Sequence, residues 1–182
     1  MELIKKRWSP VAFSDRAVTP REMEALFEAA RWAPSSYNAQ PWRFFYGLKG
    51  DDMYPVLYNL INAANRTWAR TAPALVLVVA ETVFSGRDKP NRHAYYDTGM
   101  AVGQMLIKAT EMDLYAHQMG GFDVERSVND LSLPPHQEPV AMMAVGYKGD
   151  PSQLPAEVAE RENAVRNRKP VDELVLNRNF ES

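Results

Sequence analysis

The segment Ala-Pro-Ser-Ser-Tyr-Asn-Ala-Gln-Pro-Trp-Arg-Phe, residues 33–44, decides how the rest of this chain is interpreted. Pro34 and Pro41 restrict the backbone at both ends of the segment and favour extended geometry in the residues before them. Between the prolines lie four short polar side chains that can satisfy turn backbone locally: Ser35, Ser36, Asn38 and Gln40. The pattern predicts a rigid polar loop that presents ordered donors to a ligand. Capping of the neighbouring helix explains the same residues equally well.

Composition limits the class of protein and of ligand. A chain of 182 residues with 46% hydrophobic residues fits one domain, 1–182, with a proper core, which excludes disordered and fibrous proteins. The net charge of -2 gives no broad cationic field for nucleic acid, so any site for a polyanion must be local. A small phosphate compound fits this charge better than a duplex does.

The absence of cysteine excludes disulfides, thiolate nucleophiles and sulfur-ligated metals. The first residues, 1–8, are charged and do not resemble a secretion signal. The longest apolar run, residues 72–80, is too short to cross a bilayer. We therefore expect a cytoplasmic protein that binds neither membrane nor nucleic acid.

The first half of the chain is predicted to contain three helices and a strand. A short basic helix should end at Ser9-Pro10. Thr19-Pro20-Arg21-Glu22 has the pattern of a capping box and predicts a helix to about residue 32. The aromatic residues 42–46 predict a strand. A further helix is expected from Asp51 or Asp52 to residue 64.

The second half should supply the central strand and the longest helix. Residues 75–80 are apolar at every position, which predicts a strand covered on both faces. Residues 82–91 should form a surface loop or lid. Within the helix expected at 92–112, Gly99 and Gly103 are each unfavourable by about 1 kcal/mol and suggest close approach of another backbone. That backbone could belong to the same chain or to a twin helix across a dimer axis.

Strands are also expected at residues 114–117 and 140–147. Beyond Asp150 the chain is too polar to supply its own core, so residues 150–182 are predicted to form an arm that lies across a surface of a partner subunit.

Several kinds of chemistry lack their motifs in this sequence. The histidines at positions 93, 117 and 136 are far apart and belong to no HExxH-like arrangement, so we expect structural roles for them and no metal site. G-x-S-x-G, Walker and G-x-G-x-x-G patterns are also missing. Scattered arginines, the polar loop, the Gly120-Gly121 turn and many aromatic residues suit a flat phosphorylated cofactor.

Four motifs together resemble the FMN-dependent nitroreductase family: Arg7-x-Ser9, Ala30-Arg31-Trp32-Ala33-Pro34-Ser35-Ser36-x-Asn38-x-Gln40-Pro41-Trp42, Asn65-x-x-Trp68-Ala69 and Gly121-Phe122. The resemblance covers nearly the whole chain, and the block from Pro34 to Trp42 is its specific part. It implies an α+β fold with a mostly antiparallel central sheet flanked by helices. It also implies a homodimer with two flavins at its interface.

The resemblance implies a role for each motif. Arg7 and Ser9 would hold the FMN phosphate together with Arg166 and Arg168. The flavin would be reached from the opposite subunit by Pro34, Ser35, Ser36 and Asn38. Asn65 would bond the ribityl chain or the pyrimidine edge. The ring would be lined by Gln118, Met119, Gly120 and Gly121, with a backbone N–H near N5. No catalytic residue is expected, since the cofactor carries the redox step.

Three positions depart from the family pattern. Val11 stands where many relatives have a third basic residue, so fewer cations, or Lys6, would hold the phosphate. Trp68 stands where some relatives have a lysine, so Arg66 or Arg70 would neutralise reduced N1. Gly120 replaces an acidic residue and leaves the substrate and nicotinamide preferences open.

The expected activity is therefore ping-pong: NADH or NADPH reduces FMN, which then reduces a nitroaromatic, a quinone or an activated alkene. Alternatives are other flavin chemistry on the same fold, namely dehalogenation, enal or semialdehyde reduction or flavin breakdown, and a non-catalytic flavin carrier or interaction domain.

Overall fold

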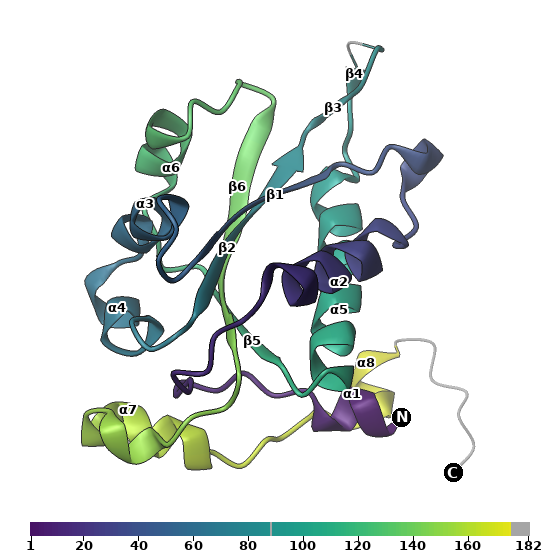
Figure 1. Cartoon of the computed structure of the whole chain (residues 1–182). Helices are drawn as coiled ribbons and strands as arrows, with labels where there is room; N and C mark the ends of the chain where they lie inside the picture. The colour runs from purple at the N-terminus through teal and green to yellow at the C-terminus, as the bar shows by residue number, and fades with distance from the viewer. Residues whose placement is uncertain (88, 176–182) are drawn as a thin grey trace.

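A four-stranded antiparallel sheet separates two layers of helices in the computed structural model, which describes residues 1–87 and 89–175 (Figure 1). The strand order is β1 (Trp42–Leu48), β2 (Ala74–Glu81), β6 (Gln137–Gly146) and β5 (Tyr115–Met119). One face carries α2 (Pro20–Arg31) and α5 (Ala94–Glu111); the other carries α3 (Met53–Leu60), α4 (Ala63–Ala69) and α6 (Val124–Asp130). The α+β fold with an antiparallel sheet is thus confirmed.

Strand β2 lies between β1 and β6 and is buried from Ala74 to Ala80. Successive side chains of a strand point to opposite faces. Leu75 and Leu77 accordingly pack with α3 and α4, while Val76 and Val78 pack with α2 and α5. Two separate hydrophobic clusters meet at this one strand, which explains why every position from Ala74 to Ala80 is apolar.

Helix α2 begins with the predicted capping box. Thr19 Oγ1 accepts from Glu22 N at 3.2 Å, and Glu22 Oε2 accepts from Thr19 N at 2.7 Å. Met23, Leu26 and Ala30 bury the inner face of the helix against the sheet. The capped start and the buried face fix α2, so that its end delivers the chain into the loop of residues 33–44.

The single helix expected from residue 51 or 52 to 64 was wrong, because the chain forms α3 and α4 instead. Ile61 is extended and forms a bridge with Phe122. Asn62 then starts α4 by accepting from Asn65 N at 2.9 Å. A strand-like residue and a new N-cap therefore interrupt the helix and turn Asn65 toward Gly121.

The two ends of the described chain lie beside each other near the C-terminal end of α5 (Figure 1). They comprise α1 (Glu2–Lys6) and α8 (Val171–Leu174). The C-terminal segment before α8 contains α7 (Ala156–Ala159), which lies away from α5, and short 3-10 turns at Pro151–Gln153 and Glu160–Asn163. Lys6 pairs with Asp113, just beyond α5, at 2.5 Å. Glu162 and Arg166 of the predicted arm form hydrogen bonds with the N-terminal segment of their own chain, and residues 176–182 of the arm lie outside the described part. Contact of the arm with a partner subunit stays a prediction.

Residues 82–91, expected as a loop or lid, contain the short antiparallel pair β3 (Val83–Phe84) and β4 (Lys89–Pro90), with residue 88 not described. Within residues 1–87 and 89–175, every helix lacks the length or the unbroken hydrophobicity that a bilayer-spanning segment requires. The expected cytoplasmic location stays a prediction.

Candidate functional site

A cavity of about 250 Å³, which we call the basic pocket, forms where the two ends of the chain meet. Its lining comprises Arg7, Trp8, Ser9, Val11, His117, Arg161, Arg166 and Arg168. The structure thus brings together the four residues that the resemblance assigned to a phosphate, although residues 7 and 168 are far apart in sequence. Their role as ligands stays a prediction.

The guanidinium groups of the basic pocket repel one another. Burial lowers the pKa of Arg7, and the positive charges of Arg166 and Arg168 lower it further. Arg7 Nη1 donates to Ser9 Oγ at 2.9 Å, which orients both side chains. Guanidinium forks match the geometry of phosphate oxygens, and an anion in this pocket would relieve the repulsion. The pocket is therefore suited to a group with more than one negative charge.

Arg166 joins the two ends of the chain as well as lining the pocket. Its guanidinium donates to the backbone carbonyls of Lys5 and Arg7. Lys6, the alternative cation, is paired with Asp113 and does not line the pocket. Arg161 lies in the pocket instead. It belongs to none of the four motifs, so the sequence did not point to it.

His117 was expected to be structural, and the structure places it in the wall of the basic pocket. Its ring stacks on Trp68 with 4.3 Å between centroids. His117 Nδ1 lies 2.8 Å from the carbonyl oxygen of Pro10. Because a carbonyl only accepts, Nδ1 carries the proton of this bond. Burial is the largest cause that lowers the pKa of His117, which favours a neutral ring whose Nε2 is an acceptor.

Asn65 and Gly121 form a second part of the site beside the basic pocket. Asn65 Nδ2 donates to Gly121 O at 3.2 Å, and Trp68 Nε1 lies 3.3 Å from Asn65 Oδ1. A Cβ added to Gly121 would lie 2.5 Å from Asn65 Nδ2 and 2.4 Å from Asn62 Nδ2, so glycine is needed for this close approach. Trp68 therefore links Asn65 to His117 and to the pocket.

Residues 118–120, at the end of β5 and just beyond it, offer different groups to a ligand. Gln118 and Gly120 are exposed, and a Cβ added to Gly120 would meet no atom within 4 Å. The side chain of Met119 is buried in the core, so only its backbone could contact a flavin.

The two arginines considered as partners of N1 both donate to backbone carbonyls. Arg66 Nε donates to Ile61 O at 2.5 Å and Arg66 Nη2 to Asn59 O at 2.8 Å, while Arg70 Nε donates to Thr67 O at 3.2 Å. Both guanidinium groups are thus bound to backbone carbonyls, and the geometry does not assign either arginine to a ligand.

The loop of residues 33–44 is strained and held in place. Tyr37, Asn38 and Gln40 have φ values of 52°, 55° and 46° in the left-handed region, which costs on the order of 1–3 kcal/mol for each such residue. Ser36 N donates to Asp97 Oδ2 at 2.9 Å, and this carboxylate on α5 is buried. The loop is therefore preorganised by a contact with a different element.

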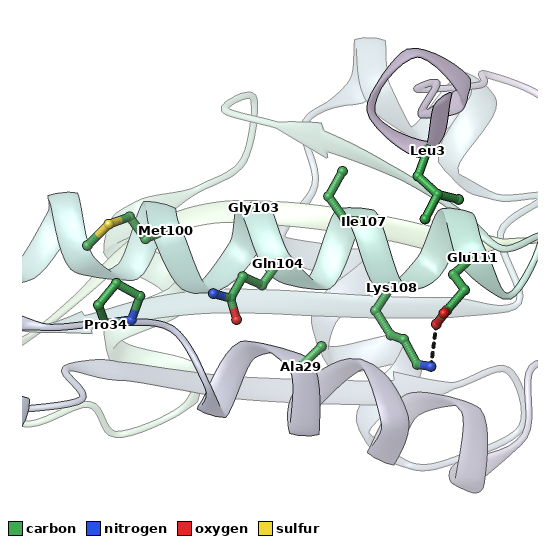
Figure 2. A pocket seen from close by; sticks show the side chains of 9 residues that line it. All are labelled: Leu3, Ala29, Pro34, Met100, Gly103, Gln104, Ile107, Lys108 and Glu111. Carbon is green, nitrogen blue, oxygen red and sulfur yellow. Dashed lines mark hydrogen bonds and ion pairs between the residues drawn. The ribbon is translucent and has the colours of Figure 1, made fainter. Parts of the chain in front are cut away.

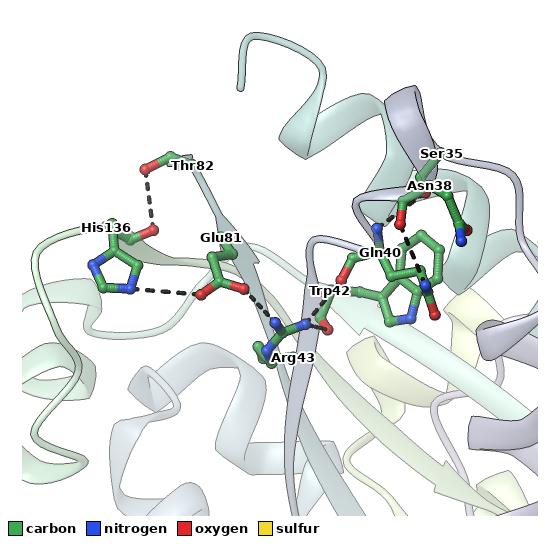
Figure 3. Close-up of polar contacts among 8 residues, drawn as sticks. All are labelled: Ser35, Asn38, Gln40, Trp42, Arg43, Glu81, Thr82 and His136. Atoms are coloured by element: carbon green, nitrogen blue, oxygen red, sulfur yellow. Dashed lines mark hydrogen bonds and ion pairs between the residues drawn. The ribbon is translucent and has the colours of Figure 1, made fainter. Parts of the chain in front are cut away.

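Further hydrogen bonds close the loop on itself and tie it to the sheet (Figure 3). Gln40 N donates to Ser35 Oγ at 3.0 Å, and Gln40 Nε2 donates to Asn38 O at 3.3 Å. Arg43 donates to Gln40 O at 2.8 Å and pairs with Glu81 on β2. These bonds run within the loop and to α5 and β2, so capping of α2 does not explain the polar residues. Pro34 is exposed beside them.

The loop and the basic pocket lie at opposite ends of α5. Asp97, in its first turns, holds the loop, whereas Lys6 beside the pocket pairs with Asp113 just past its other end. A helix of 18 residues spans about 27 Å at 1.5 Å per residue. A small ligand that touched both groups would therefore need the loop of one chain and the pocket of another.

An apolar groove of about 610 Å³ runs along the outer face of α5 (Figure 2). Its lining comprises Leu3, Ala29, Pro34, Met100, Gly103, Gln104, Ile107, Lys108 and Glu111. A Cβ added to Gly99 or Gly103 would meet no atom within 4 Å. The structure thus contradicts a close backbone partner within the described chain as the reason for these glycines.

Comparisons with known proteins agree with this architecture. The model of the nitroreductase family matches residues 4–56 and 54–147. A solved oxidoreductase containing FMN is 32% identical, superposes with a TM-score of 0.92, and the match covers 100% of this chain and 92% of that one. An FMN complex from Desulfovibrio desulfuricans is 25% identical with a TM-score of 0.78, covering 99% and 96% of the two chains.

One curated relative connects the fold with nicotinamide cofactors by its name. This Ralstonia nicotianae protein, RSc1004, is named as a candidate NADH dehydrogenase/NAD(P)H nitroreductase and is 25% identical over 159 residues, which are 77% of this chain and 80% of the relative. The family match extends through most of the chain, including Arg7, the loop of residues 33–44, Asn65 and Gly121. This chain therefore belongs to the nitroreductase family.

Proposed function

We propose that this protein is a homodimeric FMN-dependent oxidoreductase that takes electrons from NADH or NADPH. The observation that carries the proposal is the basic pocket, which gathers four arginines from both ends of the chain. The similar oxidoreductase containing FMN and the FMN complex from Desulfovibrio desulfuricans support the choice of cofactor. The name of the Ralstonia nicotianae relative supports the choice of donor.

The residues of this chain fit FMN both at its phosphate and at its ring. Arg7, Arg166 and Arg168 would bind the phosphate, with Ser9 orienting Arg7. Asn65 would donate to or accept from the ribityl chain or the pyrimidine edge, while Gly121 leaves room for the ring. When bound, FMN supplies hydride acceptance at N5 and electron transfer to a second substrate.

The dimer would complete this site. The loop at Ser35, Ser36 and Asn38 lies too far from the basic pocket of its own chain to share one flavin with it. In a dimer packed through the apolar groove, the loop of one chain would reach the flavin of the other. The small side of α5 at Gly99 and Gly103 would allow the two α5 helices to approach closely.

The acceptor would enter beside the loop, where the β3–β4 hairpin borders the site. Tyr37 packs edge-to-face on Phe84 with centroids 5.9 Å apart, and Arg87 lies 5.5 Å from the centre of the Tyr37 ring. Aromatic surfaces of this kind suit flat acceptors such as quinones, nitroaromatics and activated alkenes. We assign no acid or base, since water can supply the protons of the acceptor.

Anaerobic mixing of the FMN-loaded protein with NADH or NADPH tests this proposal. We expect at least one nucleotide to bleach the flavin absorbance, and a quinone added afterwards to restore it, as a ping-pong sequence requires. Failure of both nucleotides to bleach the flavin would contradict the proposed donor and the ping-pong sequence.

A further inference from the structure

We propose that Arg161, positioned by Glu162, is a fourth phosphate-binding cation of the basic pocket. The inference rests on the proposed function, because it concerns the phosphate of FMN. The residue lies outside every motif that led to the family and outside the residues matched by the family model.

The position of Arg161 supports its role. It lines the basic pocket together with Arg7 and Arg168. The pKa of His117, which lies in the wall of the same pocket, is lowered mainly by burial and also by the positive charge of Arg161. Among residues 1–87 and 89–175, no carboxylate forms an ion pair with Arg161, in contrast to Lys6 and Lys148. Its charge is therefore available to an anion.

Glu162 fixes the backbone that carries Arg161. The side chain of Glu162 is only 4% exposed and pairs with Lys148 Nζ at 3.0 Å. Its two oxygens also accept from Trp8 Nε1 and from Val11 N, each at 2.9 Å. A buried carboxylate with three donors holds one geometry, because losing any of these bonds would leave a desolvated charge. Glu162 thus attaches the segment at residues 160–163 to the N-terminal side of the pocket.

The same contact involves Val11, which also lines the basic pocket. Its side chain is buried in the core, while its backbone N–H donates to Glu162. The position therefore supplies no cation itself but anchors the residue next to Arg161.

The role of Arg161 is tested by measuring the Kd of FMN and the Kd of riboflavin for the apoprotein. Quenching of the flavin fluorescence reports the binding. Riboflavin lacks the phosphate, so it reports on the rest of the site. Arg161→Ala should raise the Kd for FMN about tenfold or more and leave the Kd for riboflavin unchanged. Arg161→Lys should lose less, because it keeps the charge but not the fork. Arg21→Ala removes an exposed arginine on α2 and should change neither Kd.

The Glu162→Ala variant tests whether Glu162 positions Arg161 or acts only through its negative charge. If Glu162 positions Arg161, the Kd for FMN rises and the Kd for riboflavin stays unchanged, even though a negative charge near the phosphate has been removed. An unchanged or lower Kd for FMN would overturn the positioning role. Glu160→Ala, an exposed neighbour with the same charge change, is the matched control and should leave FMN binding as in the wild type.

Three outcomes decide the inference about Arg161. An unchanged Kd for FMN in Arg161→Ala would overturn it, and so would equal losses of FMN and riboflavin, which indicate a general structural effect. Both failures leave the proposed function intact if the wild type binds FMN. A wild-type apoprotein that binds neither flavin would overturn the proposed function and this inference together.

Discussion

FMN binding is expected to weaken by roughly 1.5–3 kcal/mol when Arg168 or Arg7 is replaced by alanine, which corresponds to about a 10- to 150-fold rise in Kd. Each substitution removes a charge-assisted contact with the phosphate. Arg168 gives the cleaner test, since its guanidinium donates only to the carbonyl of the adjacent Asn167 among the described contacts. Arg7→Ala also removes the bond to Ser9.

The stability of the apoprotein serves as the control for these variants. The pKa of Arg7 is lowered by burial and by the charges of Arg166 and Arg168, so removal of one of these charges relieves repulsion in the absence of an anion. Thermal unfolding of apo Arg168→Ala should therefore occur at a temperature no lower than that of the wild type. Flavin retention equal to that of the wild type in both variants would show that the phosphate binds elsewhere.

A second large effect is expected from Gly103→Glu, which should convert the proposed dimer into a folded monomer that does not retain FMN. The substitution places a charge in the apolar groove, where a second copy is proposed to pack. Within one chain a Cβ at residue 103 meets no atom within 4 Å, and glutamate favours helix over glycine by about 0.5–1 kcal/mol. The monomer itself should therefore remain folded.

Light scattering coupled to size exclusion measures this outcome, and circular dichroism verifies the fold. Arg92→Glu, an exposed substitution near the start of α5, is the control and should leave the dimer unchanged. A Gly103→Glu variant that remains dimeric, with its FMN retained, would mean that the apolar groove is not the dimer interface.

The parts of the fold that could be predicted from sequence were those set by local chemistry or by strong periodicity. The pattern Thr19-Pro20-Arg21-Glu22 requires only contacts within one turn, and it formed the expected capping box. The apolar run in β2 predicted burial on both faces, because no other position in a sheet tolerates it. The break at Ile61 was missed, since it depends on a bridge to Phe122, distant in sequence.

The candidate site divides in the same way. The motif residues Arg7 and Asn65 could be named from the resemblance. The structure connects them, because Trp68 contacts both Asn65 and His117, and His117 lines the basic pocket with Arg7. The hydrogen bond from Ser36 N to Asp97 could not be predicted, because the sequence does not indicate which loop a carboxylate in a helix will contact. Arg161 was missed for a similar reason: its place depends on how Glu162 is bound.

The visible absorption spectrum of the purified protein, with the flavin then released and identified, tests the central claim most directly. The account predicts a yellow dimer that carries one FMN per chain. Colourless protein that stays colourless after incubation with FMN would contradict it.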